Sequence, residues 1–299
     1  MRSARGRRGV QVAKPARASP PRLPYACSVT PAQLSRTIRH LLCRGLPDSS
    51  GDLSATRVVV ESPPRRGEGD YATGIAFRVA AASGRAPGEV AASLCARLLA
   101  EADGIADARV VGGGFINVTL TPRARAGLVR SLTADRPAGM PDPAAEPGPE
   151  PGDVPARDIP RWAALTGESP RDLAVRSERA GSLFRVQYAH ARACALLRNG
   201  RRLGIGPAAE CAEPLAPAGA RLLALLADRA RITSPGPLAR HLDAVAGAFA
   251  AFRESCEPLP RGEEKPGAAH RGRLALAEAT QAVLAGGLSQ LGVTAPAHL

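Results

Sequence analysis

The pattern of apolar and polar positions differs between the two halves of the chain. In the first half, apolar residues recur three or four positions apart in some stretches, which predicts helices, while other stretches are runs of β-branched residues, which predict strands. The predicted elements are helices near 34–42, 75–79 and 87–98 and strands at 57–61, 109–111 and 115–120. Such a mixture predicts a small α/β domain with a mixed or antiparallel sheet at residues 29–122.

The second half shows helical spacing alone. Apolar stripes begin at Val186, around Leu222, at Pro237 and at Leu274, and this number of helices at these spacings predicts an all-α bundle at residues 157–299. Between the two, residues 123–156 begin with a short helical stretch and continue into sequence rich in Pro, Gly and acidic residues, which predicts a linker. The predicted fold class is therefore α+β.

Three local signals refine the domain limits. Residues 1–28 are basic and without periodicity, which predicts a disordered arm; a translation start at Val29 is an alternative explanation of this segment. Thr30 and Gln33 have the spacing of a capping box before a helix that opens with proline. Asp70 is placed to cap the helix that carries Ile75 and Val79.

The chain of 299 residues has 40 basic and 27 acidic residues, a formal net charge of +13. Seven of the basic residues precede Leu23, so the remainder carries only +6. Almost all of the basic residues are arginine, since the lysines are Lys14 and Lys265 alone. The charge therefore permits an anionic partner without identifying one.

The six cysteines are isolated from one another, with no Cys-x-x-Cys pair. This spacing argues against a zinc site and against a disulfide framework, and it favours free thiols in a reducing compartment. No run of the sequence approaches the roughly 18 apolar residues of a membrane span. The sequence predicts a cytoplasmic protein with no metal and no membrane partner.

The strand at 115–120 carries the first candidate site. Alternation places Phe115 and Asn117 on the face opposite Ile116 and Val118. An exposed aromatic ring beside an amide can stack on an unpaired base and hydrogen-bond its edge. The alternative is that helices cover both faces and Phe115 belongs to the core.

The helix predicted to begin at Val186 carries the second candidate site. Tyr188 and Arg192 lie four residues apart, so they share one face and can meet a partner together. The alternative is an ordinary amphipathic helix whose Tyr and Arg are solvated. His190 borders the apolar stripe, so we expect it and Gln187 to have structural roles.

These stretches resemble arginyl-tRNA synthetases. Residues 186–192 (VQYAHAR), 244–256 and 292–296 are similar to that family's anticodon-binding helical domain. Residues 61–76, particularly 69–73 and 75–76, and residues 112–117 are similar to its additional N-terminal domain. The resemblance implies that Phe115 and Asn117 contact a base of the tRNA D-loop. It also implies an anticodon interface formed by Tyr188, Arg192, Thr294, Ala295 and Pro296.

The catalytic domain that separates these two parts in the family has no counterpart. The resemblance implies a His-x-Gly-His string and a lysine-rich loop, yet none of the five histidines has another three positions on, and the chain has two lysines. Nor do other catalytic motifs appear, such as Gly-x-Ser-x-Gly. We therefore predict no catalytic residues and no cofactor.

The sequence thus predicts a non-catalytic tRNA-binding protein, with tRNA for arginine as its leading ligand, similar to the stand-alone synthetase-related anticodon-binding proteins of high-GC actinobacteria. Two alternatives stay open. One is an arginine–tRNA ligase, which would need ATP and Mg²⁺. The other is a regulator or subunit that binds a protein such as an intact synthetase.

Overall fold

The computed structural model describes residues 29–45, 57–61, 63, 69–134, 142–146, 152–179, 181–210 and 215–299. The arm predicted at 1–28 and the middle of the predicted linker lie outside these ranges. The elements of the first half are α1 Pro31–Gly45, β1 Tyr71–Thr73, α2 Ile75–Ser83, α3 Pro87–Glu101, β2 Ile105–Val111, β3 Phe115–Leu120 and α4 Pro122–Ala134. Those of the second half are α5 Pro155–Thr166, α6 Pro170–Leu173, α7 Ser182–Arg202, α8 Pro217–Asp228, the 3-10 turn η2 Arg229–Arg231, α9 Pro235–Ser255 and α10 Ala268–Gln290.

The sheet has the strand order β1-β3-β2, and both pairings are antiparallel. This confirms the predicted α+β class and makes β3 the central strand. Between β2 and β3, Gly112 and Gly113 adopt φ values of 57° and 78°, which side chains with a Cβ rarely adopt. The triple glycine therefore forms the turn between the two strands that the sequence predicted at 109–111 and 115–120.

The predicted start of α1 is confirmed. Thr30 donates its backbone N–H to Gln33 Oε1 at 2.7 Å, and Gln33 donates its backbone N–H to Thr30 Oγ1 at 3.2 Å. Each side chain thus accepts a hydrogen bond from the other residue's backbone N–H group, which is the arrangement of a capping box. Pro31 and Pro87 begin α1 and α3, where the missing amide hydrogen costs nothing.

Two local predictions were wrong. Residues 57–61 do not form a strand, because only Glu61 pairs, in a single bridge with Ala72. Asp70 does not cap α2. Its carboxylate instead accepts two hydrogen bonds from Arg125 at 2.9 Å each and one from the backbone N–H of Leu120 at 2.7 Å. Charge-assisted hydrogen bonds from Arg125, 55 residues away, are stronger than those that the backbone N–H groups of α2 could donate to Asp70.

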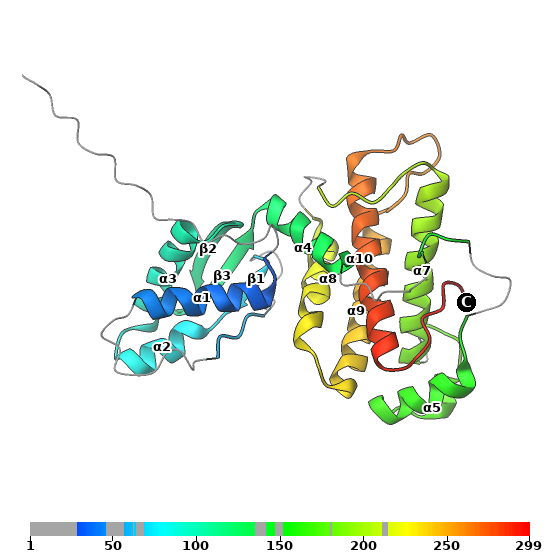
Figure 1. The fold of residues 1–299 in the computed structure, drawn as a ribbon, viewed down its shortest axis with the longest axis horizontal. Helices are drawn as coiled ribbons and strands as arrows, with labels where there is room; N and C mark the ends of the chain where they lie inside the picture. Colours follow the sequence, from blue (N-terminus) through cyan, green and yellow to red (C-terminus); the bar gives the residue numbers. More distant parts are fainter. Residues whose placement is uncertain are drawn as a thin grey trace, which may run out of the picture.

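The segment assigned to the linker begins with a packed helix. Ala124, Leu128 and Val129 of α4 are buried, and α4 contacts α10 and α8 of the second half as well as β3. Figure 1 shows α4 between the sheet and the bundle. The predicted linker can therefore begin only after α4.

The second half is helical, as predicted. In it α7, α9 and α10 contact one another, and α8 packs on α9 and α10 (Figure 1). Trp162 of α5 is fully buried and donates its indole N–H to Ser182 Oγ at 2.7 Å. Burying this large ring with its only donor satisfied fixes α5 to the start of α7.

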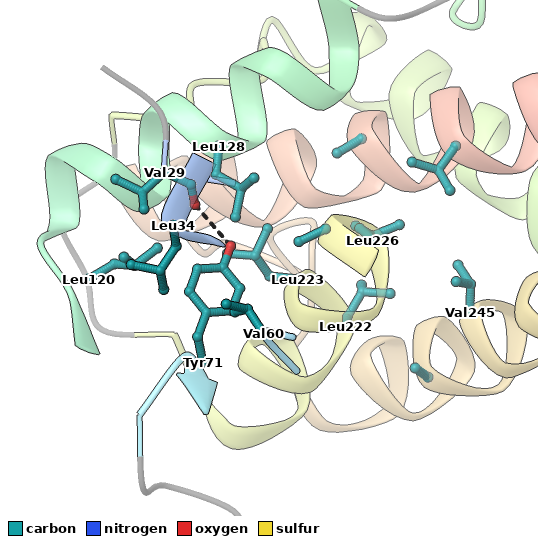
Figure 2. Packing of buried hydrophobic residues seen from close by; sticks show 14 of the residues in the cluster. Val29, Leu34, Val60, Tyr71, Leu120, Leu128, Leu222, Leu223, Leu226 and Val245 are labelled. Carbon is teal, nitrogen blue, oxygen red and sulfur yellow. Dashed lines mark hydrogen bonds between the residues drawn. The ribbon is translucent and has the colours of Figure 1, made fainter. Parts of the chain in front are cut away.

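One apolar core runs through both halves. Figure 2 shows Tyr71 and Val60 of the first half beside Leu222 and Leu223 of α8. The Tyr71 hydroxyl donates to the Val29 carbonyl at 3.0 Å, and burial raises the pKa of Tyr71 far above its usual range, with Asp70 adding to the rise. The two predicted domains are thus held together by buried apolar surface.

Two further findings concern the helices and the cysteines of the described ranges. Within the described ranges, no helix is both long and apolar enough to cross a membrane. Cys43, Cys95, Cys194 and Cys256 are free thiols, and all but Cys43 are buried.

Candidate nucleic-acid interface

A pocket of about 530 Å³ lies beside the sheet. We call it the sheet pocket; its lining residues come from the segment before β1, from β1 and α2, and from the facing strands. They are Arg57, Val59, Glu61, Ala72, Thr73, Gly74, Ile75, Arg78, Val111, Phe115 and Asn117. A volume of this size is typical of sites for small organic ligands or for a single group of a larger one.

Phe115 forms an exposed wall of the sheet pocket. Its side chain is 49% exposed, and its ring meets Phe77 edge-on, with centroids 5.0 Å apart. Gly74 leaves the room for this arrangement, since a Cβ there would lie 3.1 Å from the Phe115 ring. Phe115 is therefore not part of the core, and about half of the residue is open to solvent.

Asn117 lines the same pocket but is only 6% exposed. It sits in the middle of the sheet, paired with Ala72 of β1 and Arg109 of β2. The strand alternation that put Asn117 beside Phe115 is thus correct. Because Asn117 is almost entirely shielded from water, hydrogen bonds of its amide are stronger than those of an exposed amide.

The charged residues of this pocket were not predicted from the sequence. Arg57 and Glu61 come from the segment before β1, and Arg78 comes from α2, where it donates to the Arg57 carbonyl at 3.1 Å. Nothing in the local sequence marks these residues, because only the fold brings them to Phe115.

The second candidate surface is a row of rings and guanidinium groups along α7, which we call the aromatic ladder: Arg176, Phe184, Tyr188 and Arg192. Phe184 and Tyr188 stack with centroids 5.7 Å apart. Arg176 lies 5.5 Å from the Phe184 centroid, and Arg192 lies 5.9 Å from the Tyr188 centroid. Cation–π attraction orients both guanidinium groups over the rings.

Tyr188 and Arg192 therefore share one face, as the four-residue spacing predicted, but they are two members of a longer row. Arg253 of α9 lies close enough that burial and the charge of Arg192 lower its pKa. Phe184, Arg176 and Arg253 were not predicted from the sequence. The spacing of Phe184 four residues before Tyr188 could have revealed that residue, whereas Arg253 follows only from the packing of α9 on α7.

The predicted loop residues Thr294, Ala295 and Pro296 are engaged within the protein. Gln187 Nε2 donates to the Thr294 carbonyl at 3.1 Å and to Thr294 Oγ1 at 3.2 Å. Ala295 packs against the core, and Pro296 is buried. These contacts bind the segment after α10 to α7.

His190 completes this contact. Its Nδ1–H donates to the Pro296 carbonyl at 2.8 Å, so Nε2 is left to accept from Gln281 Nε2 at 3.0 Å. His190 is 2% exposed and Gln187 is 3% exposed. The structure therefore places both where their predicted structural roles require, while the loop residues present little free hydrogen-bonding capacity to a ligand.

Among the described side chains, no group of three His, Cys, Asp or Glu could hold a metal ion. The sheet pocket and the aromatic ladder instead offer aromatic rings for stacking, polar groups for hydrogen bonds, and arginines that can bind negatively charged groups. This combination suits unpaired nucleotides.

Comparison with known proteins adds the family context. Residues 32–120 match the family model described as the arginyl tRNA synthetase N terminal domain, and residues 186–299 match that of the DALR anticodon binding domain. The first match contains every residue that lines the sheet pocket. The second contains Tyr188 and Arg192 of the aromatic ladder.

Two curated relatives carry the description arginine–tRNA ligase. One, from Frankia alni, is 38% identical over 138 residues, which cover 43% of this chain and 25% of the relative. The other, from Clavibacter sepedonicus, is 38% identical over 156 residues, or 48% of this chain and 28% of the relative. The matched part of the chain thus spans only about a quarter of the length of these relatives.

Proposed function

We propose that this chain, an arginyl-tRNA-synthetase relative that carries that family's N-terminal domain and DALR anticodon-binding domain, binds tRNA for arginine without aminoacylating it. The observation that carries the proposal is the pairing of an exposed ring and a buried amide, Phe115 and Asn117, in one pocket of the N-terminal domain. In this function the pocket takes an unpaired base of the D-loop. Stacking on the ring and hydrogen bonds to the amide together recognise the base.

The aromatic ladder supports a second contact. Both of its rings and Arg192 lie on α7, the helix in which the DALR match begins. Unpaired bases of the anticodon loop can stack beside Tyr188, while Arg192 and Arg253 lie against the phosphates. Arginines in such positions make binding strongly dependent on salt.

The non-catalytic part of the proposal rests on what lies between the two matches. Only residues 121–185 separate them, and their described elements are α4, which packs on the bundle, and the short helices α5 and α6. The direct apolar packing of the first half on α8 occupies the junction between the two domains (Figure 2). Arginine-dependent pyrophosphate exchange by the purified chain would contradict this part.

The binding proposal is tested by titrating purified tRNAs against the full chain at two salt concentrations. Phe115→Ala and Tyr188→Ala should each weaken binding of tRNA for arginine by about 5-fold to 100-fold, because stacking on one ring contributes about 1–3 kcal/mol per base. Leu99→Ala and Leu203→Ala are matched controls, since both side chains are about half exposed and lie outside the two surfaces. Weak and equal binding to all tRNAs, unchanged by either aromatic variant, would contradict the proposal.

A further inference from the structure

A short part of the predicted linker, residues 142–146, lies at the C-terminal end of α7; we call it the acidic segment. Asp142 Oδ1 accepts a hydrogen bond from the backbone N–H of Ala144 at 2.9 Å, and the Asp142 carbonyl accepts one from that of Ala145 at 3.0 Å. A turn of this kind around an aspartate fixes the local backbone, and Pro143 within it is buried. The acidic segment therefore holds its carboxylates in defined positions.

Both carboxylates of the acidic segment pair with arginines in the last turn of α7. Arg201 Nη2 donates to Asp142 Oδ2 at 2.7 Å. Arg202 Nη2 donates to both carboxylate oxygens of Glu146 at 2.8 Å, and Arg202 Nε donates to Oε1 at 3.2 Å. Since a guanidinium group binds phosphate with the same fork of N–H donors that binds a carboxylate, Asp142 and Glu146 occupy positions that phosphate groups could take.

The main effect of these two ion pairs is on the charge of the surface. All four side chains are more than half exposed, and exposed ion pairs add little to the stability of a fold. They do cancel two adjacent positive charges, in a chain whose formal net charge is +13. Without the acidic segment, Arg201 and Arg202 would attract RNA of any sequence, because contacts to phosphate carry no sequence information.

The position of Arg201 makes such binding unproductive. Arg201 follows Arg192 along α7 by about two and a half turns, at 3.6 residues per turn. The two residues therefore lie on opposite sides of the helix, and Arg201 faces away from the aromatic ladder. RNA bound to Arg201 would lie on the side of α7 that carries no ring of the ladder.

We propose that the acidic segment is an autoinhibitory cover, in which Asp142 and Glu146 substitute for phosphate groups on Arg201 and Arg202 and keep RNA of unrelated sequence off this end of α7. The cover leaves the sheet pocket and the aromatic ladder as the places where RNA binds. The inference rests on the proposed function, because such a cover has a role only in a protein that binds RNA. It goes beyond that function, since neither the D-loop contact nor the anticodon contact involves these four residues.

The test compares the wild-type chain with the double variant Asp142→Asn/Glu146→Gln, which keeps the size of both side chains and removes their charge. Each protein is titrated with tRNA for arginine and with a short oligouridylate at several salt concentrations. The double variant should bind the oligouridylate severalfold more tightly at low salt. Its slope of log K against log salt concentration should become steeper by about 1.4, because each further phosphate bound on a single strand contributes about 0.7. Affinity for the tRNA should rise less, so discrimination between the two RNAs should fall.

Two further proteins serve as controls. Glu89→Gln/Glu263→Gln removes two exposed carboxylates outside the acidic segment and changes the net charge by the same amount, so it should leave the slope for oligouridylate at its wild-type value. Adding Arg201→Gln and Arg202→Gln to the Asp142→Asn/Glu146→Gln variant should return that slope to its wild-type value.

An unchanged slope in Asp142→Asn/Glu146→Gln would overturn the inference. An equal increase in the Glu89→Gln/Glu263→Gln control, or an increase that remains after both arginines are replaced, would also overturn it, because the effect would then be one of net charge alone. The proposed function is judged separately. If Phe115→Ala and Tyr188→Ala leave the affinity for tRNA unchanged, that function fails, whereas the oligouridylate titrations still decide for or against the cover.

Discussion

Asp158 and Thr294 are joined by two hydrogen bonds although 136 residues separate them. Thr294 donates its backbone N–H to Asp158 Oδ1 at 3.3 Å and its hydroxyl to Oδ2. Gln187 Nε2 donates to the same carboxylate at 3.1 Å. Asp158 is fully buried, so this one side chain ties α5 and α7 to the segment after α10.

We expect Asp158→Asn to lower the free energy of unfolding by about 2–4 kcal/mol, because the new amide turns an N–H group toward donors and the buried network loses its charged acceptor. Urea denaturation of both proteins measures this difference. Asp142→Asn is the control: its carboxylate is about half exposed and pairs with Arg201 at 2.7 Å, and such pairs contribute less than about 1 kcal/mol. Equal losses in the two variants would contradict a special role for Asp158.

Gly74→Ala should weaken tRNA binding more than it changes stability. The added Cβ would lie 3.1 Å from the Phe115 ring, and the half-exposed ring can move away from it, which displaces the stacking surface. We expect severalfold weaker binding with a change in unfolding free energy of about 0.5 kcal/mol or less. Gly206→Ala is the control, because a Cβ there meets nothing within 4 Å. Unchanged binding by Gly74→Ala would show that the ring position does not matter.

Arg192→Gln should lower tRNA affinity for all sequences alike and reduce the slope of log K against log salt concentration by about one, the effect of losing one phosphate contact. Titrations at four salt concentrations give this slope. Arg201→Gln is the comparison, since Arg201 lies at the other end of α7 and pairs with Asp142. The same change of slope in both variants would mean that the ladder is not the place where the backbone of the RNA binds.

Stability should fall when the pH is lowered from about 6.5 to 4. Burial, and next the charge of Arg229, lower the pKa of His241 from 6.5 to about 4. Within this window the unfolded chain binds a proton that the folded chain does not, so unfolding becomes more favourable as the pH falls, by up to about 3 kcal/mol. His241→Gln should flatten the pH dependence of the unfolding free energy relative to wild type; an unchanged slope would assign it to other groups.

The sequence predicted those parts of the fold that carry local signals. Pro31 and Pro87 start helices, and the triple glycine turns the chain between β2 and β3. The errors have long-range causes: Asp70 pairs with Arg125 of α4, and residues 57–61 form a backbone bridge to the sheet at Glu61 only, while Val59 accepts a side-chain hydrogen bond from Thr73. A strand as short as Tyr71–Thr73 has no periodicity of its own to detect.

The residues of the two candidate surfaces also divide into those with a local sequence signal and those placed by long-range packing. Phe115 and Tyr188 could be identified because each stands at a position set by its own element. Glu61, Arg78 and Arg253 could not, since each reaches its surface only through the packing of another segment. The RNA-binding roles of all these residues, and of Thr294, Ala295 and Pro296, stay predictions that the binding experiments address.

The apolar core that passes from Tyr71 to α8 also has a consequence for the integrity of the chain. Helix α4 belongs by sequence to the first half, yet its buried side chains lie against α10 and α8, so neither half alone has a closed apolar surface. If a protease site is inserted between residues 146 and 152 and cut, the two pieces should remain associated as complementing fragments. The backbone connection would then be dispensable for assembly once folding is complete.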